Sequence, residues 1–132
     1  MMRADMQVST LCFRIAVLTG LAGMVWGMAM AGSGDHATLP AHAHLNLLGW
    51  LALFAAGVFY RLHPALDRSR LALLQTILWV LATLVMTVGV ALIYSGRPDA
   101  GEPLAGIGGA VLVADMLLFV ALVWRSTAAP AA

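Results

Sequence analysis

Two histidines and an asparagine, His42, His44 and Asn46, begin an apolar stretch long enough to cross a bilayer. Polar side chains are costly in hydrocarbon, so residues of these types inside a membrane usually have a partner. Imidazole is also the commonest protein ligand for transition metals and an axial ligand of haem. The cluster therefore indicates either a bound cofactor or a set of histidines solvated in the headgroup layer.

The composition is typical of a membrane protein, because 62% of the 132 residues are hydrophobic and 10% are charged. An average soluble domain is about half apolar and about a quarter charged. A net charge of +1 argues against nucleic acid as a partner, since no basic face is available to neutralise phosphates. The single Cys12 excludes an internal disulfide and a multi-cysteine metal site. We therefore expect the lipid bilayer to surround the chain.

Four apolar stretches match the roughly 20 residues that a helix needs to cross a bilayer. They lie at about residues 11–31, 41–62, 71–95 and 104–124. The connections between them are short, which favours antiparallel packing of consecutive helices. The predicted fold is all-α: an integral membrane four-helix up-and-down bundle that forms a single transmembrane domain over residues 1–132.

The arginines predict the orientation of these helices. Six of the seven lie at the start of the first stretch, in the second connection and after the fourth stretch: Arg3, Arg14, Arg61, Arg68, Arg70 and Arg125. The seventh, Arg97, is in the third connection together with Asp99 and Glu102. Cytoplasmic loops carry the excess of positive charge, so we expect both termini to be cytoplasmic in a bacterial inner membrane, with the histidine cluster near the outer face.

The first stretch has a second interpretation. It ends in Ala29-Met30-Ala31, which is similar to the cleavage site of a secretory signal peptide. Its apolar run is longer than the roughly 7–15 residues of such a signal, which favours an uncleaved first helix. Cleavage would leave three helices and would not change the side on which His42 lies.

Helical geometry separates the two histidines. Residues two apart on an α-helix point about 200° apart, so His42 and His44 cannot both ligate one metal from a regular helix. The face that begins at His42 continues through Asn46 and Gly49, and is small and polar. The face that begins at His44 continues through leucines. Geometry favours His42 as the inward residue, unless the helix begins after it.

The string His-x-Asn-x-x-x-Trp, read from His44 to Trp50, enters a helix that ends Phe59-Tyr60-Arg61-Leu62-His63-Pro64. It resembles the second transmembrane helix of the haem–copper oxidase large subunit, and is most similar to the nitric oxide reductase branch. The resemblance implies that the motif histidine is an axial ligand of a low-spin haem b. It falls on His44 if Asn46 is the anchor, and His42 is the neighbouring alternative.

The resemblance covers about one helix well, and the chain departs from the family elsewhere. The large subunit carries its other haem ligands and the histidines of its active-site metal on later helices. This chain has no histidine within its later predicted helices. We therefore expect no site that reduces oxygen or nitric oxide, and the enzyme interpretation is weak because no nucleophile–base pair or nucleotide motif is present.

A haem held by two axial ligands needs a second donor. The candidates are the other motif histidine, His36 in the first connection, and three methionines of the first stretch, Met24, Met28 and Met30. A homodimer could also contribute one histidine from each copy.

The leading hypothesis is a small haem-b-binding protein associated with respiratory electron transfer. Such a protein could be a subunit of a respiratory-chain complex. One alternative is a cofactor-free accessory or assembly protein. The other is a copper- or haem-handling protein, since methionine and histidine together suit Cu(I).

Asp115 lies near the middle of the fourth stretch, where a carboxylate needs a partner. Thr83 of the third stretch is expected at a similar depth, so we predict a hydrogen bond between Thr83 and Asp115. The functional alternative is a proton-handling carboxylate. A small-residue repeat of Gly106, Ala110 and Ala114 suits close helix contact, within the bundle or between copies.

Overall fold

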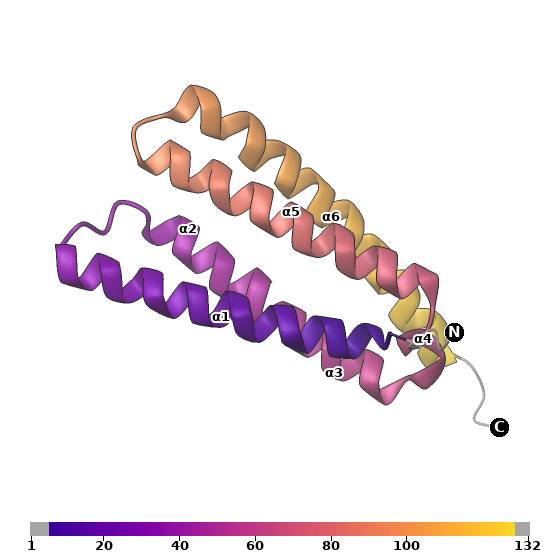
Figure 1. Ribbon diagram of the computed structural model, residues 1–132. Helices are drawn as coiled ribbons and strands as arrows, with labels where there is room; N and C mark the ends of the chain where they lie inside the picture. The colour runs from indigo at the N-terminus through magenta and orange to yellow at the C-terminus, as the bar shows by residue number, and fades with distance from the viewer. Residues whose placement is uncertain (1–5, 129–132) are drawn as a thin grey trace, which may run out of the picture.

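The computed structural model describes residues 6–128, and within this range the chain is helical with no strand. The elements in order are α1 (Val8–Ser33), α2 (Leu39–His44), the π-helix η1 (Leu45–Ala52), α3 (Leu53–Leu62), the short α4 (Pro64–Asp67), α5 (Arg70–Tyr94) and α6 (Pro98–Ala128) (Figure 1). The elements α2, η1 and α3 follow one another without a break from Leu39 to Leu62, and we call them the second span.

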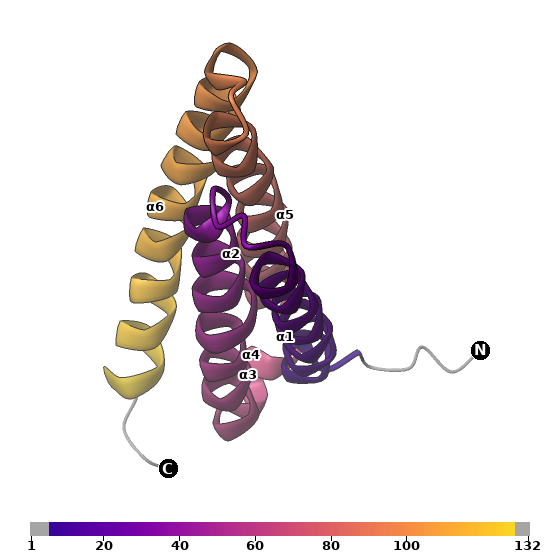
Figure 2. The same ribbon diagram turned by 90° about the vertical axis from the view of Figure 1, so that its left-hand side faces the viewer.

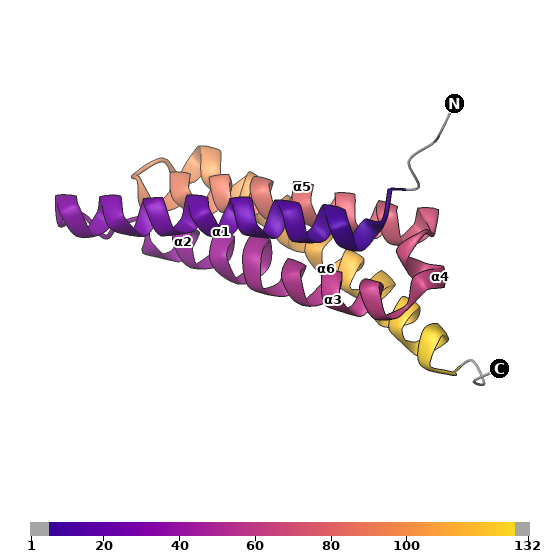
Figure 3. The ribbon, with the colours of Figure 1, turned by 60° about the horizontal axis from the view of Figure 1, so that its bottom comes forward.

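The helices form two hairpins. One contains α1 and the second span, which run side by side, and the other contains α5 and α6 (Figures 1 and 3). The second span lies between α1 and α6 (Figure 2). The start of α1 and the end of α6 lie at the same end of the bundle, close to α4. The predicted all-α four-helix bundle is therefore confirmed as an arrangement of four long apolar helices.

The observed helices begin and end at somewhat different residues from those predicted. The largest difference is at α6, which begins at Pro98 rather than near residue 104. Proline suits the first helical position because its missing N–H would have no partner there, and Asp99 in the first turn interacts favourably with the helix dipole.

The π-helical turn of the second span is fixed by its two neighbours. A wider turn changes which backbone groups are paired within the helix, and such turns occur often at functional sites. Here the Leu48 carbonyl accepts a hydrogen bond from Trp79 Nε1 of α5 at 3.0 Å. The Gly49 carbonyl accepts one from Thr19 Oγ1 of α1. The π-helix is therefore hydrogen-bonded to both α1 and α5.

Glycines allow α1 to approach the second span closely. Three of them face side chains across the contact: Gly20 faces Trp50, Gly23 faces Asn46 and Gly27 faces His42. A Cβ at Gly20 would lie 3.0 Å from the Trp50 ring, and one at Gly27 would lie 3.1 Å from His42 Cε1. This half of the bundle is packed without room for a ligand between α1 and these three side chains.

Backbone approaches backbone between α5 and α6. A Cβ at Gly89 would meet the Gly101 carbonyl at 2.8 Å, and one at Gly108 would meet the Met86 nitrogen at 2.7 Å. Gly106 belongs to the predicted small-residue repeat, yet a Cβ there would meet nothing within 4 Å. Within the described residues, the close contact therefore uses Gly101 and Gly108, and the repeat faces outward.

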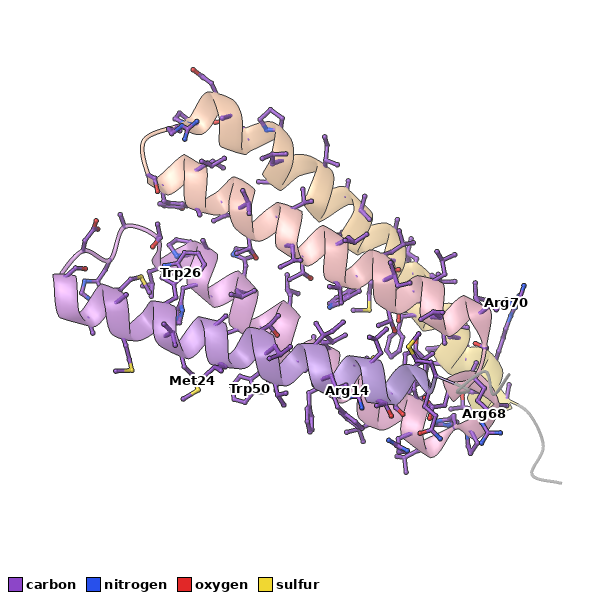
Figure 4. All side chains as sticks on the ribbon, viewed as in Figure 1. Arg14, Met24, Trp26, Trp50, Arg68 and Arg70 are labelled. Atoms are coloured by element: carbon purple, nitrogen blue, oxygen red, sulfur yellow. The ribbon has the colours of Figure 1, made fainter. Side chains whose placement is uncertain are left out.

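A buried carboxylate closes the end of the bundle near α4. Asp67 is 3% exposed and accepts hydrogen bonds from the backbone nitrogen and the hydroxyl of Ser9, at 2.6 and 2.8 Å. Ser9 is in the first turn of α1, where backbone N–H groups have no partner within the helix. Asp67 therefore caps α1. Arg68 and Arg70 lie at the same end (Figure 4). On α1, the side chain of Met24 points away from the rest of the bundle.

We predict that Gly108→Ala destabilises the fold and that Gly106→Ala does not. The Gly108 Cβ would press against the α5 backbone, and such overpacking typically costs about 1–3 kcal/mol. Alanine at Gly106 enters open space and gains helix propensity. Thermal unfolding followed by circular dichroism in detergent measures the difference, and equal midpoints for the two variants would contradict the predicted α5–α6 contact.

Candidate functional site

The second span directs its two histidines to opposite sides, as the helical geometry predicts. His42 faces α1, where its ring makes an edge contact with Trp26 at a centroid distance of 6.3 Å. The Asn46 amide nitrogen lies 3.1 Å from His42 Nε2. His42 and Asn46 are thus partners of each other in the contact with α1, where the ring also covers Gly27.

His44 faces the other hairpin and has a defined tautomer. Its Nδ1 lies 2.7 Å from the Pro40 carbonyl oxygen. A carbonyl can only accept, so Nδ1 carries the proton, and in the neutral ring Nε2 keeps its lone pair. Metal-ligating histidines usually donate their second nitrogen to a carbonyl or carboxylate in this way. No hydrogen bond to His44 Nε2 occurs among residues 6–128.

His44 lines a groove between the second span and the α5–α6 hairpin. The groove has a volume of about 510 Å³, which lies within the roughly 300–1,000 Å³ typical of ligand pockets. Its lining residues are Ala43, His44, Leu47, Leu48, Met86, Gly109, Leu112 and Val113. His44 is the one ionisable side chain in this lining. Leu47 and Val113 are exposed, so the groove opens at the outer surface of the bundle.

The groove combines features that suit a flat apolar cofactor with an iron centre. Apart from His44 the walls are apolar, and Gly109 contributes no side-chain volume. Histidine nitrogen is the usual axial ligand of haem iron. The chemistry of the donor therefore fits a haem, with His44 Nε2 as the ligand and the Pro40 carbonyl as the group that orients it.

The other predicted site residues lie elsewhere. His36 is exposed in the connection before α2, with its Nδ1 3.0 Å from the Gly34 carbonyl. Met28 is 76% exposed on α1. Met30 is buried, and its sulfur accepts a hydrogen bond from Thr38 at 3.6 Å. In the described part of the chain, no three His, Cys, Asp or Glu residues gather as a metal site.

Asp115 has a different partner from the one predicted. Its Oδ2 accepts a hydrogen bond from Gln75 Nε2 at 2.6 Å, and Gln75 Oε1 accepts one from the Tyr60 hydroxyl at 2.6 Å. Thr83 Oγ1 has no partner among the described residues, so the predicted Thr83–Asp115 bond is wrong. Gln75 lies about two helical turns closer to α4 than Thr83, and this is the level of Asp115.

The Tyr60–Gln75–Asp115 chain joins the second span, α5 and α6 at one level of the core. Tyr60 is fully buried, and Gln75 and Asp115 are each 3% exposed. The sequence carried a signal for it, since Gln75 is the one amide within the apolar stretch 71–95. The three residues lie in different elements from His44 and do not line its groove.

Comparisons of the chain with protein-family models, with curated proteins and with solved structures found no match. At the groove of His44, a ligating atom and a volume sufficient for a ligand occur together.

We predict that Gln75→Leu lowers the free energy of unfolding by about 2 kcal/mol or more. The substitution removes the partner of both the Tyr60 hydroxyl and Asp115, and a buried polar group without a partner costs about 1–3 kcal/mol. Thr83→Val is the matched control on α5, because the Thr83 hydroxyl has no hydrogen bond to lose. Chemical unfolding in detergent measures both, and a Gln75→Leu variant as stable as Thr83→Val would refute a structural role for the network.

Proposed function

We propose that this chain is an integral membrane protein of the bacterial inner membrane that binds haem b through His44 and takes part in respiratory electron transfer. Support for a membrane location comes from the four helices, each long and apolar enough to cross a bilayer. Large apolar side chains are exposed along all four, and such surfaces suit lipid rather than water.

The proposed orientation follows from the arginines. Arg61, Arg68 and Arg70 lie at the α4 end of the bundle, and Arg14 and Arg125 lie in the corresponding ends of α1 and α6. The positive-inside rule assigns this end to the cytoplasm, together with both termini. His44 then lies toward the opposite, outer side of the membrane, because α2 is at the other end of the second span.

The observation that carries the haem proposal is the state of His44. Its Nδ1–H is held by the Pro40 carbonyl, and its free nitrogen belongs to a residue that lines an apolar groove of about 510 Å³. His44 is also the residue on which the resemblance to the haem–copper oxidase helix places a haem ligand. His42, the neighbouring alternative, is occupied by Asn46 and packed against α1.

The residues around the groove would have different roles in holding a haem. A bound haem would supply a one-electron carrier. His44 would hold the iron, and the Pro40 carbonyl would fix the ring and raise the basicity of its ligating nitrogen. Leu47, Leu48 and Leu112 would keep water from the site, since all three line the groove. Burial in an apolar pocket is one of the means by which a protein sets a haem potential.

The test is a reduced-minus-oxidised spectrum of the protein purified in mild detergent after expression with ample haem supply. We expect Soret and α bands that are lost in His44→Ala. His63→Ala is the matched control, because His63 Nδ1 also lies 2.7 Å from the carbonyl four residues before it, that of Phe59, but far from the groove. His63→Ala should keep the bands.

His42→Ala tests which of the two motif histidines ligates the iron. This variant should also keep the bands, provided that circular dichroism shows it to be folded. Bands that are absent from the folded wild-type protein, or that persist in His44→Ala, would contradict the haem proposal. In the first case, metal analysis of the same sample distinguishes the copper alternative from a cofactor-free accessory protein.

A further inference from the structure

The groove at His44 contains a second atom that can ligate iron. Met86, from the second half of α5, lines the same groove. Of the groove-lining residues in the described chain, His44 and Met86 are the two with a nitrogen or sulfur in the side chain. They come from different walls, because His44 belongs to the second span and Met86 to the opposite hairpin. We infer that Met86 is the second axial ligand of the haem proposed to bind at His44.

The surroundings of Met86 suit this role. Its side chain is partly buried, and its terminal methyl group lies 3.9 Å from the position that a Cβ of Gly109 would occupy. Glycine at 109 thus leaves open the space next to the thioether. Methionine has three rotatable bonds and a polarisable sulfur, so it can turn within a groove without movement of its helix.

The other candidates for a second ligand are placed less well. Met24 and Met28 are 64% and 76% exposed on α1, across the second span from the groove. Met30 is buried against Thr38. His42 is packed between Asn46 and Gly27, and His36 lies in the exposed connection before α2. None of these five residues lines the groove.

A histidine–methionine pair would give this haem a particular character. Methionine as an axial ligand raises the reduction potential of a haem relative to a nitrogen ligand. Two axial ligands also leave the iron without a free position. A haem held in this way would transfer electrons at a comparatively high reduction potential and would not bind a gas at the iron. The assignment of Met86 rests on the proposed haem site.

The experiment compares Met86→Leu with Met116→Leu in the purified, haem-loaded full-length protein. Met116 is the matched control, because it lies on α6 and lines a different cavity from His44. In Met86→Leu we expect loss of the low-spin spectrum, a fall in midpoint potential and the appearance of carbon monoxide binding in the reduced state. Met116→Leu should behave as the wild type. Magnetic circular dichroism of the oxidised protein should show the charge-transfer band of a methionine sulfur bound to haem iron in the wild type and in Met116→Leu, but not in Met86→Leu.

A second variant keeps the test decisive if Met86→Leu loses its haem. Met86→His restores a strong ligand at the same position, and we expect a low-spin haem with a potential below that of the wild type. The role of Met86 is overturned if Met86→Leu keeps the wild-type spectrum and potential, or if it loses haem that Met86→His does not restore. The haem proposal itself survives those results when His44→Ala still abolishes binding, and both fall if the wild type binds no haem.

Discussion

The arrangement of this molecule depends on how the π-helical turn of the second span satisfies its backbone carbonyls. Away from water, each backbone polar group must find a partner within the protein. The Leu48 carbonyl finds Trp79 on α5, and the Gly49 carbonyl finds Thr19 on α1. These bonds join adjacent residues to two different helices, so together they fix both the position and the rotation of the second span. That rotation places His42 against α1 and His44 in the groove.

The hydrogen bond of His44 to the carbonyl four residues earlier is a local feature that the helix alone provides. His63 forms the same bond at the same 2.7 Å, yet its ring packs against Phe59 with a centroid distance of 4.2 Å. What distinguishes His44 is therefore its surroundings: an apolar space formed by two other helices. A ligating histidine in this fold is defined by the packing of the hairpins rather than by its own helix.

Much of the fold could be predicted from the sequence, because the apolar stretches are long and glycine and proline separate them. The opposite directions of His42 and His44 also followed from helical geometry alone. The partner of Asp115 did not, because it depends on the axial offset between α5 and α6, and an error of two turns exchanges Gln75 for Thr83. The groove and Met86 were missed for the same reason: they exist only through the relative placement of the second span, α5 and α6.

The bond between Asp67 and Ser9 joins residues 58 positions apart, and it has a consequence for the order in which the chain acquires structure. Because Asp67 precedes α5, everything needed to cap α1 has been synthesised before the second hairpin exists. The same is true of the glycine contacts that hold α1 to Asn46 and His42. The contacts within the first hairpin can therefore form before α5 and α6 are present, and the bond from Trp79 to the Leu48 carbonyl and the far wall of the groove are added with the second hairpin.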